Sequence, residues 1–430
     1  MTHFHNFNNL PDNVVQNVES YQLTQIAWLL LENALIRNSN RHFDDLPNFK
    51  GQLGSTVTFN REPQAIYTPG SIIPNLQPIK QKKLSLSIDQ QGNSSFAIPP
   101  FEQYFNIDPT NWKPNVQTAA LKEMGTAVEV ALGERLKECF RWYGDGTTAI
   151  NSAQQLATIV EYFEEFGASN NNMMAVLPSI IYPQFAATML QEFAINRNNE
   201  LSDYSWYKGN YNGCEWGKSK LLPIHTAGTA GTGAIELTVV STDDPTGVNV
   251  TQITCSGSIG TDANCIKKFD CLRFKDGVTN LPNMRYLTYH GHHETQKNYV
   301  TMCAAADAAS SGGSVTITLT HPLCSVTGIA ENNINHPIQA GMKILVMPSH
   351  RVGVIMSGNP LYLAMPNPGE WIKTDPYHQS VVVDEETGIS VCMYEGWSVD
   401  KGARFTSMPM LYGTTIEPLN AMRILIPLTQ

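Results

Sequence analysis

Charged residues are scarce in this sequence: Asp, Glu, Lys and Arg make up only 15% of its 430 residues, against about 25% in an average globular protein. A free monomer with so few charges is difficult to keep soluble and unassociated. We therefore expect copies of the chain or partner molecules to cover much of its surface. A polar surface rich in Asn, Thr and Ser is the other interpretation that the composition allows.

An excess of positive charge is also missing. The chain carries 28 Lys and Arg against 38 Asp and Glu, which gives a net charge of −10. Nucleic-acid-binding proteins usually show a basic footprint. This balance argues against tight, saturating contact with DNA and leaves open a position close to DNA without strong binding.

Long apolar runs are absent as well. The most apolar stretch, residues 26–36, is interrupted by Glu32 and Asn33 and is far shorter than the roughly 20 residues that a transmembrane helix needs. The first residues lack the basic start and apolar core of a signal peptide. We expect a protein that is made and used in a cytoplasm.

Motifs that carry chemistry are not found either. The eight cysteines form no CxxC pair, so we expect structural free thiols, with metal ligands and disulfides as the alternatives. YHGHHE at residues 289–294 is interpreted as a polar loop, and GTAGTG at residues 228–233 as a flexible hinge, because no GK[ST] follows it. The acidic pairs at 164–165 and 384–385 are interpreted as solvated. We expect no catalytic site, no metal and no cofactor.

Several segments show helical periodicity. The apolar spacing predicts helices over residues 18–37 and 152–167, and YPQFAATMLQEF predicts another at 182–193. The strongest pattern, residues 114–143, begins at a proline and ends before Gly144, which suits a left-handed C-terminal cap. A helix of that length is a rod of about 45 Å.

Two alternating segments, residues 55–60 and 82–89, predict half-buried strands. The long connection between them cannot be helical, because it holds four prolines, namely Pro63, Pro69, Pro74 and Pro78. We interpret it as an extended excursion away from the body of the protein. The lysines at its end either touch acidic groups of another subunit or keep an exposed β-edge from pairing wrongly.

From about residue 226 to 336 the sequence is rich in Gly, Ser, Thr and Asp, with short β-branched runs. This texture predicts an all-β module, which begins and ends within an α/β chain as an inserted domain does, and which we expect to fold on its own. The segments 343–348 and 352–356 predict a return to buried strands of the body. A hairpin over residues 380–399 and a closing strand over 422–428 complete the pattern.

The order of these segments resembles the Hong Kong 97-type capsid proteins of tailed bacteriophages, and more narrowly the P-twenty-two-type coat proteins with an inserted β-barrel. The likeness covers nearly the whole chain and is carried by a series of segments rather than by one motif. These segments are GSTVTFNREP (54–63), LSLSIDQQGNSSFAI (84–98), LLPIHTAGT (221–229), IKKFDCLRFKDGV (266–278), DEETGISVCMYEGWSV (384–399) and MLYGTTIEPLNAMRIL (410–425).

The resemblance implies an α+β fold with an N-terminal arm, an extended β-loop, a spine helix, peripheral and axial domains, and an inserted all-β barrel. The corresponding division of the chain is 1–45 for the arm and its helix, 46–100 for the extended loop, 101–150 for the peripheral domain with the spine helix, 151–225 for the first axial part, 226–340 for the inserted barrel, 341–380 for the second axial part, and 381–430 for the peripheral hairpin and closing axial strand.

The resemblance also implies a function: a non-enzymatic subunit that assembles into hexamers and pentamers of an icosahedral shell around double-stranded DNA. Its implied partners are a scaffolding protein, a portal protein, a possible decoration protein and DNA bound without sequence specificity, and its place is the virion, assembled in the host cytoplasm. The alternatives are an encapsulin-like cargo shell and a β-rich carbohydrate-binding or hydrolase protein. The candidate inter-subunit contacts are Arg61, Glu62, Lys80, Lys82, Lys83 and Asp89.

Overall fold

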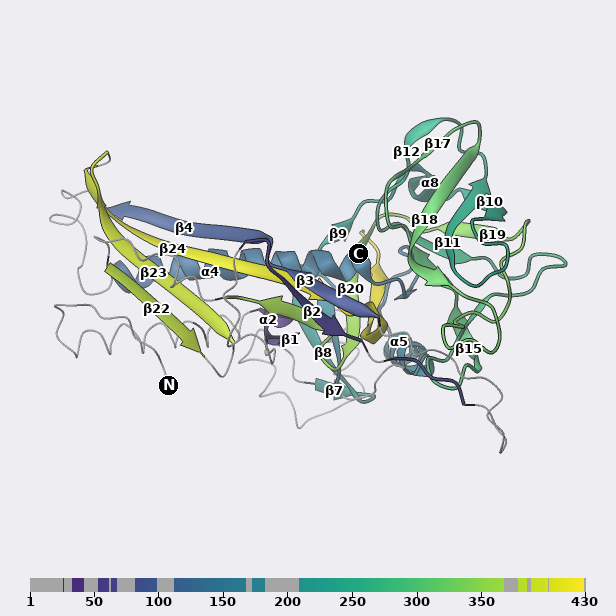
Figure 1. The fold of residues 1–430 in the computed structure, drawn as a ribbon, viewed down its shortest axis with the longest axis horizontal. Helices are drawn as coiled ribbons and strands as arrows, with labels where there is room; N and C mark the ends of the chain where they lie inside the picture. Colours follow the sequence, from purple (N-terminus) through teal and green to yellow (C-terminus); the bar gives the residue numbers. More distant parts are fainter. Residues whose placement is uncertain are drawn as a thin grey trace.

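The protein is an elongated α+β molecule with a long blade at one end and an all-β module at the other (Figure 1). The structure, a computed structural model, describes residues 26, 33–41, 53–61, 63–67, 82–98, 112–167, 172–181, 209–366, 378–384, 388–400 and 402–428. The helix expected over 182–193 lies outside this part of the chain. So does most of the helix expected over 18–37, of which a single turn, α2 (Ala34–Arg37), is described.

The blade is a sheet with the spine helix along it (Figure 1). Its strands run in the order β1, β21, β24, β23, β22, and β4 also pairs with β24. The bounds are β1 (Ser39–Asn40), β4 (Gln90–Ile98), β21 (Leu361–Ala364), β22 (His378–Asp384), β23 (Ile389–Ser398) and β24 (Ala403–Ile416). The expected hairpin is confirmed as β22 and β23, paired from His378 with Glu395 to Asp384 with Ile389.

The spine helix α4 (Trp112–Arg135) packs on β4 and β24. It is shorter than the sequence predicts: after Arg135 the chain makes a 3-10 turn, η2 (Leu136–Glu138), and then a short strand, β5 (Trp142–Tyr143). The helical prediction beyond Arg135 was wrong because a tertiary pairing, β5 parallel to β25, takes over there. Gly144 has a positive φ of 102°, but it follows this strand instead of capping a helix.

A second sheet forms the body and runs in the order β5, β25, β20, β6, β8, β7, with β9 also on β20. Its bounds are β6 (Met173–Pro178), β7 (Gly209–Tyr211), β8 (Cys214–Ser219), β9 (Ile224–His225), β20 (His350–Ser357) and β25 (Ala421–Ile426). The short 3-10 turn η4 (Pro418–Asn420) directly precedes β25. The strands expected at 352–356 and 422–428 are confirmed within two residues at each end.

Successive residues of this sheet face two different cores. Val354 of β20 packs in the cluster that contains the spine helix, whereas its neighbour Ile355 packs in the cluster that contains α5 (Ala153–Glu165). On β6, Val176 and Ala175 divide in the same way. The sheet is therefore the middle layer between the spine helix and the α5 side, which explains why its strands are apolar on both faces.

Helix α5 begins and ends where the sequence predicts. The Ser152 hydroxyl accepts a hydrogen bond from the backbone N–H of Gln155, and the Gln155 side-chain oxygen accepts one from the backbone N–H of Ser152, which is a capping box. Gly167 closes the helix with a φ of +78°.

The all-β module is one six-stranded antiparallel sheet in the order β16, β13, β19, β10, β11, β18, with two small two-stranded sheets, β12 with β17 and β14 with β15. Its first and last strands also meet, since Ala304 bridges Leu319 and the Ala305 N–H donates to the Thr318 carbonyl. The bounds are β10 (Glu236–Thr242), β11 (Val250–Ser256), β12 (Asp262–Ile266), β13 (Cys271–Phe274), β14 (Arg285–Leu287), β15 (Glu294–Tyr299), β16 (Thr301–Cys303), β17 (Ala308–Ser310), β18 (Ser314–Leu323) and β19 (Lys343–Val346).

The boundary of this module differs from the expected 226–340. Strand β19 pairs with both β10 and β13 and so lies inside the module sheet, although its sequence, KILV, was assigned to the body. An apolar strand has the same sequence pattern in either sheet, so only its pairing partners show to which sheet it belongs. Residues 226–347 are the better division.

The glycine run at the entrance of the module is packed rather than hinge-like. Residues 229–232 form a single helical turn, α8 (Thr229–Thr232), with Ala230 and Gly231 buried. A Cβ at Gly228 would stand 2.4 Å from the Cys265 carbonyl oxygen, and one at Gly231 would stand 2.5 Å from that of Met347. These glycines allow close backbone approach, and the interpretation as a flexible hinge was wrong.

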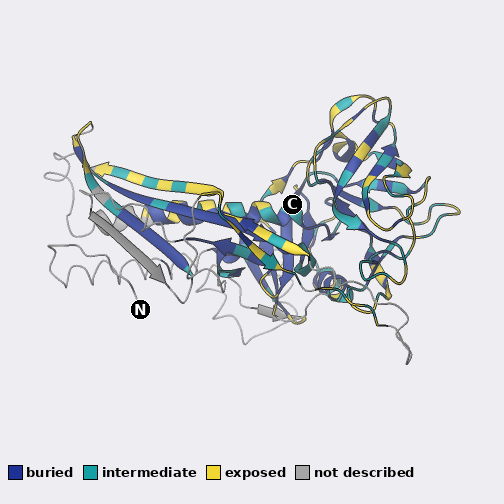
Figure 2. Ribbon diagram, viewed as in Figure 1, coloured by how far each residue is buried: buried dark blue, intermediate teal, exposed yellow. Residues whose placement is uncertain are grey.

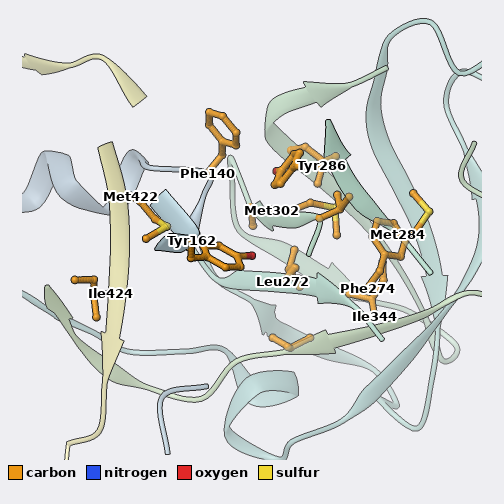
Figure 3. Packing of buried hydrophobic residues seen from close by; sticks show 14 of the residues in the cluster. Phe140, Tyr162, Leu272, Phe274, Met284, Tyr286, Met302, Ile344, Met422 and Ile424 are labelled. Carbon is orange, nitrogen blue, oxygen red and sulfur yellow. The ribbon is translucent and has the colours of Figure 1, made fainter. Parts of the chain in front are cut away.

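The module shares its core with the body. One continuous cluster joins Phe140 and Tyr162 of the body to Tyr286 and Met302 of the module (Figure 3). The Phe140 and Tyr286 rings meet edge to face at 6.2 Å, and the Tyr162 hydroxyl donates to the Tyr299 carbonyl. This shared core argues against an independently folding module.

A fragment of residues 226–347 is therefore expected to be marginal when expressed alone, because it exposes the face that Phe140 and its neighbours cover. We expect it to bind an apolar dye and to show poorly dispersed amide NMR signals. The matched control is the full chain under the same conditions. A well-dispersed spectrum with no dye binding contradicts this expectation.

Candidate assembly surfaces and the buried junction

The two ends of the blade expose large apolar side chains. Strands β2 (Thr56–Asn60) and β3 (Lys83–Ser87) pair in register as the sequence predicts, and the chain leaving β2 carries Tyr67, which is 88% exposed. At the turn between β23 and β24, Trp397 is 55% and Val399 85% exposed. Figure 2 shows exposed residues along β4 and at this turn. Isolated exposed hydrophobics are ordinary on protein surfaces, so these residues are candidates for contact with another molecule.

These ends point in opposite directions. The chain runs from β3 directly into β4, and β4 lies antiparallel to β24 from Gln90, opposite Tyr412, to Ile98, opposite Arg404. The β2–β3 hairpin thus extends from one end of the blade and the β23–β24 turn forms the other (Figure 1). One molecule thus exposes large apolar side chains at two separated places.

The six candidate contact residues are distributed around this hairpin. Arg61 forms an ion pair of 2.6 Å with Glu417 of the same chain, where both side chains are largely buried. Asp89 stands 3.9 Å from Arg135 of the spine helix. Lys82 and Lys83 are exposed, while Glu62 and Lys80 lie outside the described residues.

The Arg61–Glu417 pair gives the base of the hairpin an attachment within its own subunit. Burial raises the pKa of Glu417, and the Arg61 charge opposes that rise. Leu86, Ile88 and Leu411 form a small core beneath the hairpin. The paired strands β2 and β3 are therefore held by their own subunit up to the point where the long connection begins.

A buried polar junction joins the module to the body, and no sequence pattern indicated it. Asp270, fully buried, accepts hydrogen bonds from His225 at 2.8 Å and from the backbone N–H groups of Gly228 at 3.1 Å and Lys267 at 2.8 Å. His225 belongs to the strand that leads into the module. One carboxylate thus fixes both the entrance to the module and the segment before β13.

Two buried arginines complete the junction. Arg423 of β25 donates to the Phe269 carbonyl at 3.1 Å and to His350 at 2.5 Å. Burial, followed by the Arg423 charge, lowers the pKa of His350, so its neutral ring accepts this hydrogen bond. Arg141 donates to the Leu419 carbonyl and lies 4.0 Å from the centre of the Phe166 ring. Burial lowers the pKa of Arg141 to about 10.

A further buried carboxylate, Glu129 of the spine helix, holds the N-terminal arm. Its oxygens accept from the backbone N–H groups of Leu35 and Ile36, each at 3.0 Å, and from the Ser219 hydroxyl at 3.2 Å. Glu129 is 1% exposed. It therefore connects α2, α4 and β8 through one side chain.

Glu129 is expected to make stability depend on pH. Burial raises the pKa of Glu129 above the ordinary value of a glutamate, although its hydrogen bonds oppose the rise. The folded state thus holds the proton more tightly than the unfolded state, and the free energy of unfolding falls as the pH rises from about 4.5 through the folded-state pKa. We expect Glu129→Gln to remove this part of the dependence.

The measurement is the melting temperature of wild type and Glu129→Gln between pH 4 and pH 8. The difference between the two curves isolates Glu129 from other titrating groups. Glu134→Gln, an exposed residue of the same helix, is the control and should follow wild type. A constant difference across this range contradicts the assignment.

The remaining sequence candidates have structural roles. Glu165 accepts hydrogen bonds from the Gln296 backbone and the Asn298 side chain, so it ties α5 to β15. His292 shares a hydrogen bond with the Asn332 carbonyl. Within the described part of the chain, no cluster of His, Cys, Asp and Glu is arranged to hold a metal, and no helix is long and apolar enough to cross a membrane. All eight cysteines are buried free thiols, as expected.

No protein-family model and no curated protein match this sequence. Solved structures do match the fold at low similarity. A structure of Mycobacterium phage Che8 is 7% identical, covers 91% of each chain and has a TM-score of 0.44. The capsid of Ralstonia phage GP4 is 7% identical over 91% of this chain and 87% of its own, with a TM-score of 0.41. The mature capsid of bacteriophage PhiM1 is 10% identical over 87% and 83%, with a TM-score of 0.40. The matched structures are mostly those of tailed phages.

Proposed function

We propose that this chain is a capsid subunit of a tailed bacteriophage, with a structural role and no catalysis. The observation that carries the proposal is the blade with an exposed apolar surface at each end, Tyr67 on one side and Trp397 with Val399 on the other. Neither end is covered by its own subunit. In a shell every subunit has neighbours on several sides, and each copy repeats the same weak contacts.

The parts of the molecule correspond to those of the Hong Kong 97-type fold that the sequence resembles. The β2–β3 hairpin would be the extended loop, α4 the spine helix, the blade sheet the peripheral domain and the body sheet the axial domain. The module sheet, whose end strands meet at Ala304 and Leu319, would be the inserted barrel.

The proposal extends to the form of the assembly, its partners and its location. The subunits form hexamers and pentamers of an icosahedral shell around double-stranded DNA, with scaffolding, portal and possible decoration proteins as partners. The net charge of −10 suits DNA enclosed without sequence-specific contact. The chain is assembled in the host cytoplasm and ends in the virion.

The test is to express the chain alone and with the scaffolding gene of its own phage, and to examine the purified products by electron microscopy. Closed icosahedral shells formed with the scaffolding protein support the proposal. A stable monomer under both conditions overturns it. Shells that form without scaffolding and package a protein cargo instead support the encapsulin-like alternative.

A further inference from the structure

Two of the eight thiols face each other across neighbouring strands at the junction. Cys271 of β13 is directly opposite Cys303 of β16, and their Sγ atoms are 4.0 Å apart. The adjacent pair, Asp270 and Ala304, is hydrogen-bonded through the Ala304 N–H, so Cys271 and Cys303 occupy a non-hydrogen-bonded position. Opposed Cα atoms are closest at such positions, about 4.5 Å apart, which lies within the range that a disulfide spans.

The surroundings make the two thiols unequal. Burial alone would raise the pKa of Cys271, but the hydrogen bond with Cys303 and the charge of Arg423 together hold it well below its usual value. The hydrogen bond with Cys271, with burial, raises the pKa of Cys303. Burial raises the pKa of the nearby Cys139 to about 12. One sulfur of the pair is thus disposed to be a thiolate and the other to remain a thiol.

We propose that Cys271 and Cys303 are an oxidation site, at which a small peroxide converts the two thiols into a disulfide between β13 and β16. Cys271 is the sulfur that reacts first. The site is distinct from the assembly surfaces and needs no partner subunit.

The oxidation of the two thiols proceeds in two steps. The Cys271 thiolate attacks one oxygen of hydrogen peroxide, the O–O bond breaks, and hydroxide leaves and takes up the proton that Cys271 gave up. Cys303 sulfur then attacks the sulfenic acid on Cys271, its S–O bond breaks, and the Cys303 proton leaves with the hydroxyl as water. Two thiols are oxidised and one peroxide is reduced to two waters.

The disulfide would change the stability of the module because one of its strands is attached to the body. β16 is attached to the body, because the Met302 carbonyl accepts from the Trp142 indole N–H at 3.2 Å and the Thr301 hydroxyl donates to the Phe140 carbonyl at 3.2 Å. A disulfide to β13 would close a chain loop within the module, at the strand that the body holds, and so stabilise the module sheet. If the proposed function holds, the thiols persist in the reducing cytoplasm and oxidise after release.

The experiment uses the purified full chain, assembled or not, treated with hydrogen peroxide or left in dithiothreitol. Free thiols counted after denaturation should fall from eight to six, and non-reduced peptide mapping should show one cross-linked pair, Cys271 with Cys303, lighter by two hydrogens. The melting temperature should rise by several degrees. Because the cross-link needs no shell, its failure and the failure of assembly are separate results.

Two variants keep the test specific. Cys303→Ala should show no cross-linked pair and no rise in melting temperature under the same peroxide, and its thiol count should fall by one at most, through oxidation of Cys271 alone. Cys255→Ala is the matched control, since Cys255 is a buried thiol of the same sheet that faces Val239 and Val315; it should fall from seven to five. An unchanged thiol count in wild type, over-oxidation of Cys271 without a cross-link, or a cross-link to Cys139 overturns the proposal.

Discussion

Replacement of residues 64–79 by a short Gly-Ser turn is expected to leave a folded subunit that fails to form closed shells. The β2–β3 pairing and the Arg61–Glu417 ion pair both lie outside the replaced segment, so the base of the hairpin keeps its attachments. The variant loses Tyr67, whose burial on a neighbour would contribute about 1.5–3 kcal/mol at every copy. A loss repeated over all contacts should reduce the yield of closed particles at least about tenfold.

Circular dichroism reports the fold of this variant and electron microscopy its assembly. Tyr67→Ser is a milder companion, and Val240→Ser, which removes a half-exposed hydrophobic from the module, is its control. Normal, robust particles from the loop variant would remove the main physical support for the capsid proposal. Misfolded aggregate would mean that the segment belongs to the core of its own subunit.

The second large effect is expected from Asp270→Ala. This change leaves His225 and the backbone N–H groups of Gly228 and Lys267 buried without their acceptor. Each buried donor that is left without its acceptor costs about 1–3 kcal/mol. We expect the variant to be recovered in low yield, with the module more sensitive to protease than the blade.

Limited proteolysis followed by mass spectrometry locates the loss. Asp307→Ala is the matched control, because Asp307 also accepts from a backbone N–H, that of Lys268 at 2.7 Å, but is exposed; it should change stability by less than about 0.5 kcal/mol. An Asp270→Ala variant with the melting temperature of wild type would show that the junction does not hold the module.

Much of the fold could be predicted because its signals are local. The alternating residues of β2 and β3, the capping box of α5 and the terminal hairpin each depend on neighbours in the sequence. The wrong predictions concern which strands pair with one another in the tertiary structure. Trp142 continued a helical pattern but pairs with β25, and β19 has the composition of a body strand but pairs within the module.

The residues of the assembly surfaces and of the buried junction were harder to predict from the sequence. The prolines between residues 60 and 83 predicted an excursion, most of which lies outside the described residues. The resemblance placed Arg61 among the candidate inter-subunit contacts, and the structure adds an ion pair between Arg61 and Glu417 of the same chain. Asp270, Glu129 and Arg423 were missed, since a buried polar residue looks like a solvated one until the fold brings its partners to it. An unpaired charge within an apolar strand, such as Arg423 in MRILIPL, is the signal that was available.

Because β3 continues directly into β4, a force on the extended loop is transmitted along the blade. A pull on the extended loop acts along β4, which is held to β24 by nine paired positions from Arg404–Ile98 to Tyr412–Gln90. The force runs parallel to the strands and perpendicular to the hydrogen bonds between them, so it shears all the pairs together instead of peeling them apart one by one. In the proposed shell, tension between two neighbouring subunits would therefore be distributed over the length of the blade, and all nine β4–β24 pairs would resist it together.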